Sequence, residues 1–461
     1  MTPVSDTFRL TGYLQPDHGA LLKRGAAGRF LKLGSSILKA GGHLVRSEFD
    51  KKKRDLLEKV EEGLSDAHVL GKKLEAAKEI VQVMGELKGA VMKLGQILSS
   101  SGDLILPPEI SNLFRELQKN APPMVWTEIE PVLKLGLSQK ISSIFKEIDP
   151  VPIASASIGQ VHRGRLLSGE EVAIKIQYPD VVAAIKSDFK NLHVLKSVLT
   201  KILPFDVDVN PILRNLKESI LAECDYLKEA ANADLFQSTY AQKYQYMIFP
   251  QVIPTASSST VLTMKLLEGE SLEQTLGRSQ ADRNELGRKL YDFHLDCCYT
   301  TGLLHGDPQN GNYLFKGEQI ILLDFGNIQK LSLDFRKHYI GFLRAIENVD
   351  MTAYRKYGKA LGIVNDKDDE EFLAKHFTLA SGLFSPFDRP GVFPPPLDNP
   401  LQLIHTFVKG LKIRGTHRPC GELAAIDRTH LGLYTKLRAW NSHLDWKGSK
   451  DRVFREFESQ L

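Results

Sequence analysis

The sequence is poor in cysteine, and its few cysteines are wrongly spaced for a disulfide framework or a zinc ribbon. Only four occur in 461 residues, at positions 224, 297, 298 and 420. No two form a C-x-x-C pair, and the adjacent Cys297 and Cys298 are poorly placed to bond to each other. The sequence therefore indicates a protein of a reducing intracellular compartment.

Long apolar runs are also missing. No stretch of about eighteen residues is apolar and uncharged enough to span a bilayer. Residues 1–6 lack the basic region and apolar core of a secretory leader. We therefore expect a protein that is not secreted and whose contact with a membrane is peripheral. Apolar residues make up 42% of the chain and charged residues 25%, which is typical of a soluble globular protein of about two to three domains.

The net charge of +4 is small but unevenly distributed. Residues 20–54 contain ten Lys or Arg and two acidic residues, so this segment carries +8 and the rest of the chain −4. Within residues 20–49, apolar side chains recur at helical spacing between the basic ones, although five glycines weaken the helix. Such a helix can lie on an anionic lipid surface, or it can pack on the body of the protein. The charge excess slightly favours the membrane interpretation.

Hydrophobic periodicity divides the chain into four parts. Residues 1–54 hold an irregular N-terminus and the basic helix, 55–140 a helical extension, 141–268 a strand-rich lobe with inserted helices, and 269–461 a helical lobe. Strands are expected at 157–167, 171–178, 247–252, 260–266, 313–315 and 319–323. Helices are expected at 188–203, 211–240, 271–276 and 283–300, with helical sequence after 328. This order indicates an α+β, bilobal protein-kinase-like fold with an N-terminal helical extension.

Two short motifs carry the chemistry. Residues 305–312 read His-Gly-Asp-Pro-Gln-Asn-Gly-Asn, and residues 324–326 read Asp-Phe-Gly. Phosphoryl transfer needs metal ions that neutralise phosphates and residues that hold nucleophile and phosphate in line. Asn312 and Asp324 supply the oxygen ligands that Mg²⁺ prefers, and Asp307 can orient or deprotonate an attacking hydroxyl or water. Together they predict a site for ATP and magnesium rather than two unrelated surface turns.

Lys175 ends the sequence Val-Ala-Ile-Lys on the second strand of a predicted hairpin. A lysine there can bind the α- and β-phosphates of ATP when a helix carboxylate holds it. The candidate carboxylates are Glu223 and Glu229, which lie six residues apart, on different helix faces, and can serve different partners. The alternatives are an ordinary edge-strand lysine and a solvated helix face. The motif that follows around Asp307 favours the phosphate role for the lysine.

The segment before the hairpin is built from small residues, namely Ala154, Ser155, Ala156 and Ser157, with a single glycine, Gly159, after them. Kinases ordinarily place a G-x-G-x-x-G loop here so that backbone N–H groups can cradle phosphates. We expect this loop to contact ATP and to be stiffer than a glycine-rich one. A plain turn at the start of a strand is the alternative.

These features together resemble the UbiB family of atypical kinases, also called the AarF or ADCK family. The resemblance covers roughly residues 87–329, over half of the chain. The similar segments are 93–96 (K-L-G-Q, the family's K-x-G-Q motif), 154–157 (its alanine-rich loop), 223–225 (its E-x-D motif), Glu229 (its helix-C glutamate) and 305–312 (its H-x-D-P-x-x-x-N loop).

The resemblance implies that the helical extension covers the active site. Lys93 would meet Glu223, Gln96 would gate access with them, and Glu229 would pair with Lys175. No Ala-Pro-Glu triplet follows the Asp-Phe-Gly motif, so a protein-kinase activation segment is not expected. Both points argue against phosphorylation of other proteins. The family is associated with coenzyme Q and other isoprenoid-lipid metabolism and with membranes, which suits the basic segment.

Two positions depart from the family pattern. Ser155 interrupts the alanine-rich loop, where a hydroxyl could add a phosphate contact or alter the preference between ATP and ADP. Gly306 stands where the family more often has Thr. The resulting His-Gly-Asp is also similar to small-molecule kinases of the aminoglycoside and choline type.

Three hypotheses follow. The first is an Mg²⁺-dependent ATPase or lipid-directed kinase of the UbiB type that supports isoprenoid quinone metabolism at a membrane surface. The second is a phosphotransferase for a soluble alcohol, and the third is a nucleotide-responsive scaffold without turnover. The expected partners are ATP or ADP and an anionic or isoprenoid lipid; no nucleic acid is expected, and a homodimer is left open.

Overall fold

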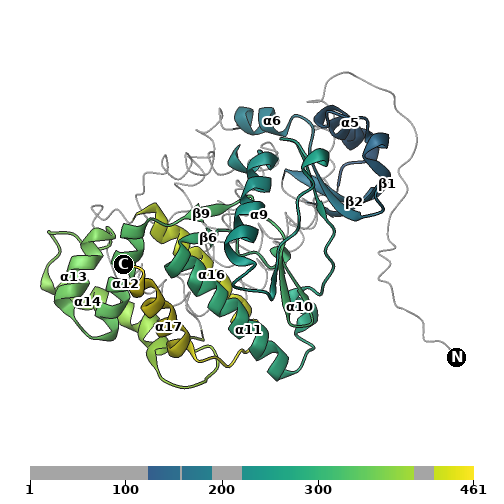
Figure 1. Ribbon diagram of the computed structural model, residues 1–461. Helices are drawn as coiled ribbons and strands as arrows, with labels where there is room; N and C mark the ends of the chain where they lie inside the picture. Colours follow the sequence, from purple (N-terminus) through teal and green to yellow (C-terminus); the bar gives the residue numbers. More distant parts are fainter. Residues whose placement is uncertain (1–122, 156–157, 189–220, 399–419) are drawn as a thin grey trace, which may run out of the picture.

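The computed structural model describes residues 123–155, 158–188, 221–398 and 420–461. These ranges form a strand-rich lobe and a helical lobe that lie side by side, blue and green-to-yellow in Figure 1. The α+β kinase-like fold predicted from the sequence is confirmed. The basic segment 20–49 and most of the predicted helical extension lie outside the described residues.

The first lobe is built on a four-stranded antiparallel sheet in the order β1-β2-β3-β5. Its strands are β1 (Phe145–Ser155), β2 (Gly159–Leu166), β3 (Glu171–Gln177) and β5 (Val261–Lys265). Alternate residues of β3, Val172, Ile174 and Ile176, are fully buried, because β-branched side chains pack well on one face of a pleated strand. Helix α5 (Trp126–Gly136) packs against them through Ile129 and Leu133. The 3₁₀ turn η2 (Ile141–Ser143) leads from α5 into β1.

Helix α9 (Tyr226–Tyr240) connects this sheet to the second lobe. Phe236 and Tyr240 of α9 are fully buried in the core cluster that also contains Leu262 of β5 and Phe325. Helix α6 (Val181–Asp188) follows β3 and adds Ile185 to the same cluster. The position of α9 is therefore fixed by apolar packing on both lobes.

Short strands lie between the two lobes. One small sheet has three strands, β4 (Met247–Ile248), β8 (Gln319–Leu322) and β7 (Tyr313–Lys316). Its middle strand, β8, is parallel to β4 and antiparallel to β7. Strands β6 (Leu303–His305) and β9 (Ile328–Lys330) form a second, antiparallel pair. The remaining short turns are η4 (Pro254–Ala256) and η6 (Asn310–Asn312). Both predicted motifs therefore lie at the ends of these strands.

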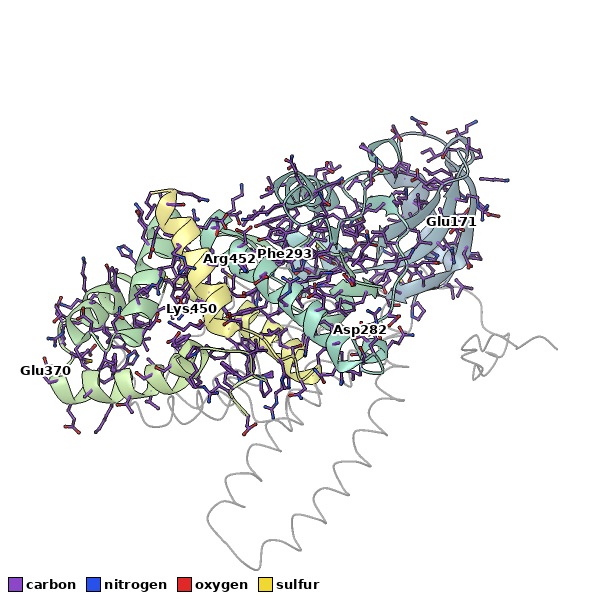
Figure 2. All side chains as sticks on the ribbon, turned by 60° about the horizontal axis from the view of Figure 1, so that its bottom comes forward. Glu171, Asp282, Phe293, Glu370, Lys450 and Arg452 are labelled. Atoms are coloured by element: carbon purple, nitrogen blue, oxygen red, sulfur yellow. The ribbon has the colours of Figure 1, made fainter. Side chains whose placement is uncertain are left out.

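The second lobe is helical. Its elements are α10 (Leu272–Thr275), α11 (Gln280–Leu295), the π-helical turn η5 (Asp296–Thr301), α12 (Leu333–Glu347), α13 (Met351–Ala360), α14 (Glu370–Phe384), η7 (Ser385–Asp388), α16 (Gly421–Ala439) and α17 (Trp446–Ser459). Helices α16 and α17 both pack against α11. Figure 2 shows Lys450 and Arg452 on α17 next to α11, and the Arg452 guanidinium donates to Asp292 of α11 at 2.6 Å.

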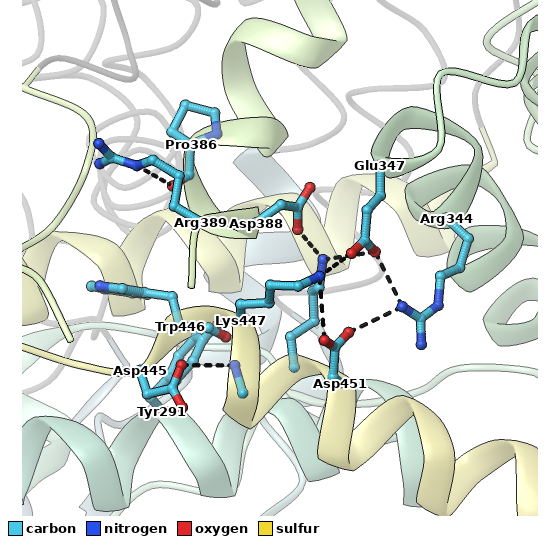
Figure 3. A network of polar contacts seen from close by, with 12 residues as sticks. Tyr291, Arg344, Glu347, Pro386, Asp388, Arg389, Asp445, Trp446, Lys447 and Asp451 are labelled. Carbon is cyan, nitrogen blue, oxygen red and sulfur yellow. Dashed lines mark hydrogen bonds and ion pairs between the residues drawn. The ribbon is translucent and has the colours of Figure 1, made fainter. Parts of the chain in front are cut away.

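An ion-pair network joins α12, η7 and α17 (Figure 3). Glu347 of α12 accepts from Arg344 at 3.1 Å and also from Lys447 of α17. Lys450 pairs with Asp388 of η7, and Asp451 pairs with Arg344 at 3.0 Å. Glu347 is mostly buried, with 14% of its side chain exposed, so solvent screens the network less than it would screen surface pairs.

Several predicted boundaries were wrong. The helix predicted at 211–240 is interrupted at Cys224 and Asp225, where Asp225 begins α9. Helix α11 starts at Gln280 rather than 283, and its predicted last turn is the π-helical η5. Strand β1 extends to Ser155, and the short strand β9 was not predicted because three residues carry too little periodicity. Helix α6 begins at Val181, earlier than the predicted start at 188, and the rest of the helix predicted at 188–203 lies outside the described residues.

Candidate active site

Lys175 lies in the middle of β3, opposite Val161 of β2 and Leu262 of β5. It is therefore on a central strand, and the alternative of an ordinary edge-strand lysine is wrong. Its side chain is only 11% exposed, and Nζ lies 2.8 Å from both carboxylate oxygens of Glu229 and 3.1 Å from Oδ2 of Asp324. The ammonium group therefore bridges the two lobes.

Glu229 reaches Lys175 because it lies in the first turn of α9. That turn is fixed by Asp225, whose carboxylate accepts from the backbone N–H groups of Leu227 at 3.1 Å and Lys228 at 3.3 Å. One turn further on, Asn232 donates to the carbonyl of Phe325 at 2.9 Å. Helix α9 is thus tied both to β3 and to the Asp-Phe-Gly motif.

The neighbouring carboxylates stabilise the charged form of Lys175. Burial alone would lower the pKa of Lys175, but the nearby carboxylates of Asp324 and Glu229 outweigh it and hold that pKa well above its usual value. The lysine is therefore charged at neutral pH. Its Nζ also lies 5.0 Å from the ring centroid of Tyr226, a cation–π distance.

The motif at 305–312 forms a tight loop after β6. His305 is buried and its Nε2 contacts the carbonyl of Asp324, which joins the two motifs. The backbone N–H of Gly306 donates to the carbonyl of Asn327 at 2.7 Å. In return, Nδ2 of the Asn327 side chain donates to the carbonyl of Gly306 at 3.2 Å. A Cβ at position 306 would lie 2.9 Å from two oxygens of Asn327. The close packing around Gly306 therefore leaves no room for a larger side chain without movement of Asn327.

Asp307 and Asn312 are in direct contact. Nδ2 of Asn312 donates to Oδ2 of Asp307 at 3.0 Å and to the Asp307 carbonyl at 3.3 Å. Asn312 is also held next to the second motif, because its carbonyl accepts from the N–H of Leu323 at 3.0 Å. Both side chains are half-buried. The structure therefore places these two predicted site residues next to each other.

Asp324 follows β8 and is oriented by its neighbours. Its Oδ1 accepts from the N–H of Gly326 at 2.8 Å, while Oδ2 lies next to Lys175. Phe325 is fully buried against Phe236 of α9, with ring centroids 5.5 Å apart. The aromatic residue thus anchors the motif in the core, and the aspartate faces the site.

These residues fit a magnesium ion. Mg²⁺ takes oxygen ligands and is usually held by one or two carboxylates together with substrate phosphates. Asp324 supplies carboxylate oxygens, and Asn312 uses its amide nitrogen on Asp307, which leaves its amide oxygen for a cation. The backbone contact between Asn312 and Leu323 keeps the two candidate ligands close together.

The predicted phosphate loop lies partly in a strand. Ala154 and Ser155 are the last residues of β1 and pair with Val161 and Gln160 of β2, so the expectation that they belong to a loop was wrong. The physical reason is that small side chains do not prevent strand pairing. Ala156 and Ser157 lie outside the described residues. Their contact with ATP stays a prediction.

The gating residues are only partly described. Lys93 and Gln96 lie outside the described residues, so their contact with Glu223 stays a prediction. Glu223 precedes α9, and a Cβ at Gly326 would lie 3.7 Å from both Glu223 Cγ and Glu229 Oε2. The structure therefore brings Glu223 to the same site as the Asp-Phe-Gly motif.

Sequence reasoning missed two basic residues of α16. Lys436 is 1% exposed, donates to the carbonyl of Pro308, and lies 4.6 Å from the ring centroid of Tyr313. Burial lowers its pKa to about 7, and the charge of Asp307 opposes that shift. Burial also lowers the pKa of Arg428, against the charges of Asp307 and Glu223. No motif surrounds these two residues, and helical periodicity alone could not have assigned them to the site.

The fold and the site define a kinase-like phosphotransferase. Residues 116–358, more than half of the chain, match the ABC1 atypical kinase-like domain, and the chain belongs to this family of atypical kinases. The predicted resemblance to UbiB kinases is confirmed.

Three relatives illustrate the similarity. The mitochondrial atypical kinase COQ8B of Rattus norvegicus is 29% identical over 370 residues, which is 80% of this chain and 70% of the relative. The mitochondrial atypical kinase COQ8 of Schizosaccharomyces pombe is 31% identical over 328 residues, 68% of this chain and 52% of the relative. The structure of Rv3197 from Mycobacterium tuberculosis, described as a complex with erythromycin, has a TM-score of 0.60 and 27% identity, and covers 85% of this chain and 99% of that one. The chain thus spans about half the length of some relatives.

The four cysteines all lie in the described residues, and none forms a disulfide. The prediction that they do not build a disulfide framework is therefore confirmed. Among the described residues, no helix combines the length and the apolar character needed to cross a membrane.

Proposed function

We propose that the protein is an Mg²⁺-dependent ATP-using enzyme of the UbiB type, an ATPase or a lipid-directed kinase that acts at a membrane surface in isoprenoid lipid or quinone metabolism. One observation carries the proposal: Lys175 bridges Glu229 and Asp324 while Asp307 contacts Asn312 in the neighbouring loop. An assembled kinase site meets two conditions. The strand lysine is paired with a helix glutamate, and the aspartate of the Asp-Phe-Gly motif lies where it can bind the metal ion.

Each residue has a separate role in this proposal. Lys175 binds the α- and β-phosphates, held in position by Glu229. Bound magnesium neutralises phosphate charge, and Asn312 and Asp324 hold it. The carboxylate of Asp307 orients the attacking hydroxyl or water and accepts its proton. Lys436 steadies the Asp307 loop through the carbonyl of Pro308.

The short link after the Asp-Phe-Gly motif supports an acceptor other than a protein. Residues 327–332 contain only β9 and the cap of α12, which begins at Leu333. No segment of this length can form the platform on which protein kinases bind a peptide. Lys93, Gln96 and Glu223 would restrict access further, as the family resemblance implies.

The membrane part of the proposal rests on the basic segment 20–49 and on the family's association with isoprenoid lipids. A helix with several lysines and arginines is attracted to anionic lipid by about 1 kcal/mol per basic residue near the surface. The rat and fission-yeast relatives are named as mitochondrial, and an organelle matrix is a reducing compartment of the kind that four cysteines without a disulfide suggest.

Mg²⁺-dependent ATP hydrolysis, measured with and without anionic liposomes, tests the proposal. We expect turnover that rises with liposomes and is lost in Asp324→Asn, because the variant loses the charged carboxylate that binds the metal ion. The matched control is Asp334→Asn, an exposed aspartate of α12 that should keep full turnover. If Asp324→Asn binds Mg²⁺–ATP as well as wild type, the metal assignment is wrong. A nucleotide-induced thermal shift without turnover would instead support the scaffold hypothesis.

A further inference from the structure

Three potential metal ligands meet behind the catalytic loop. They are His294 near the end of α11, Cys298 in η5 and His430 in α16. One ligand atom of each lies within 4.8 Å of the others. The two imidazole rings meet edge to face with centroids 4.9 Å apart. Among the described residues, this is the cluster of histidine, cysteine and carboxylate side chains best suited to a metal, and the phosphotransfer chemistry does not use it.

The local sequence explains the first half of the cluster. His294 and Cys298 are four residues apart, so they share one face of the helix, and Sγ of Cys298 lies 3.3 Å from Nε2 of His294. The chain changes from α-helix to a π-helical turn at Asp296. Such turns are frequent at functional sites because the wider turn re-aims side chains. Cys298 is directed toward α16 in this way.

His430 is already oriented as a ligand. Its Nδ1 lies 2.9 Å from the carbonyl of Ile426, to which it donates, so Nε2 carries the lone pair. Nε2 lies 3.2 Å from the hydroxyl of Tyr299. Metal-binding histidines almost always donate their second ring nitrogen to a carbonyl or carboxylate, which fixes the tautomer and the ring. Here the backbone of α16 performs this function.

The distances suit a small tetrahedral ion. With Zn–N near 2.0–2.1 Å and Zn–S near 2.3 Å, neighbouring ligand atoms in a tetrahedron lie roughly 3.3–3.8 Å apart. The separation of Sγ and Nε2 in the first pair, 3.3 Å, is already in this range, and the widest separation in the cluster must close by about 1 Å. This closure has to come from a small movement of α16 toward α11, because the Ile426 carbonyl already fixes the His430 ring.

Two separate cavities flank the cluster. One of about 20 Å³ adjoins His294, and an apolar one of about 360 Å³ adjoins His430 and Tyr299, while Cys298 lines neither. The small cavity has room for one water-sized particle.

We propose that His294, Cys298 and His430 bind a divalent zinc-class metal ion, with the Tyr299 hydroxyl or a water molecule as the fourth ligand. A thiolate with two imidazoles selects such an ion over Mg²⁺, which takes oxygen ligands. Binding replaces the thiol proton of Cys298 by a sulfur–metal bond and releases the proton to solvent, without change of oxidation state.

The bound ion would fasten α11 and η5 to α16. Helix α16 also carries Lys436, which donates to Pro308 beside Asp307, and Gly432, where a Cβ would lie 2.2 Å from the Pro308 side chain. The ion would therefore stabilise the helix that supports the catalytic loop. This role does not depend on which phosphoryl acceptor the protein uses.

Titration of the metal-free full-length chain with Co²⁺, followed by absorption spectroscopy, tests the site. We expect one Co²⁺ per chain, a thiolate-to-cobalt charge-transfer band, and intense d–d bands that report tetrahedral geometry. Added Zn²⁺ should displace the cobalt and raise the melting temperature. Cys298→Ser should abolish the charge-transfer band, whereas Cys297→Ser and Cys420→Ser should keep it.

Substitution of His430 tests the same metal site without changing Cys298. His430→Gln should weaken Co²⁺ binding by about 100-fold or more, and it carries the test if Cys298→Ser does not fold. The proposal is overturned if wild type gives no charge-transfer band, or if the band survives in Cys298→Ser. Equal loss of the band in Cys297→Ser would also overturn it, because that thiol is not in the cluster.

Discussion

Gly306 illustrates how single atoms determine the site. It has no Cβ, and this absence allows its backbone to approach Asn327 and exchange hydrogen bonds with it. That contact joins the loop of Asp307 to the segment that follows Asp324. The two motifs, separated along the chain, are thus held together at a position where a larger side chain would not fit without movement of Asn327.

Gly306→Ala should lower both stability and turnover. The added methyl group would lie 2.9 Å from two oxygens of Asn327, and relief of such overlap costs about 1–3 kcal/mol. Gly311→Ala is the matched control in the same loop, because a Cβ there meets nothing within 4 Å. The measurements are the free energy of unfolding in urea and the rate of ATP turnover, each compared between the two variants. Equal effects in both would mean that the Asn327 contact is unimportant.

The residues of the site differ in how far the sequence predicted them. The structure brings Lys175 to Asp324 and Asn312 to Asp307, and the sequence grouped these residues because each lies in a short motif with a fixed spacing. Lys436 was missed because it comes from α16, more than a hundred residues later, and contacts the loop only through tertiary packing. Local pattern carries no information on such contacts.

At the scale of elements, α9 is the part that the sequence described least well. Its periodicity suggested one helix over 211–240, but Asp225 interrupts it and caps the helix that begins at Tyr226. An aspartate immediately before a helical segment is a start signal, and it could have located this boundary. The Asp of the E-x-D motif thus positions Glu229 through the backbone, in addition to any role in gating.

Substitutions of Asp225 distinguish its role as the N-cap of α9 from a role that depends on its charge. Asp225→Ala should destabilise the protein by about 1 kcal/mol and weaken ATP binding, because the first turn of α9, which carries Glu229, loses its cap. Asp225→Asn should preserve both properties, since asparagine caps as well as aspartate. Denaturant unfolding and nucleotide titration are the measurements. If the Asn variant is as impaired as the Ala variant, the charge rather than the cap is what matters.

For the whole molecule, the ion-pair network around Glu347 links three elements of the helical lobe (Figure 3). Burial alone would raise the pKa of Glu347, but the hydrogen bond from Lys447 and the charge of Lys450 lower it to about 2. A carboxyl group whose pKa is depressed on folding contributes stability above its unfolded pKa, near 4.5, and loses it as the pH falls toward 2.

Glu347→Gln should therefore destabilise the protein by about 1–3 kcal/mol at neutral pH. The difference from wild type should stay constant above about pH 5 and shrink as the pH falls through 4, because wild type loses its own contribution there. Thermal unfolding across this pH range is the measurement. Glu458→Gln, an exposed residue of α17, is the control and should differ little from wild type at any pH. A difference that does not depend on pH would contradict the assigned ion pairs.

The contact of α16 with the catalytic loop also affects how genetic variants of this protein should be interpreted. Every residue recognisable from a kinase motif lies before position 330, yet Lys436 and Gly432 support the loop from far downstream. A nonsense or frameshift variant between residues 398 and 432 would leave all of those motifs in the reading frame and still remove the two contacts to Pro308. Such an allele would look intact to a motif search although the protein lacks the helix that supports the catalytic loop.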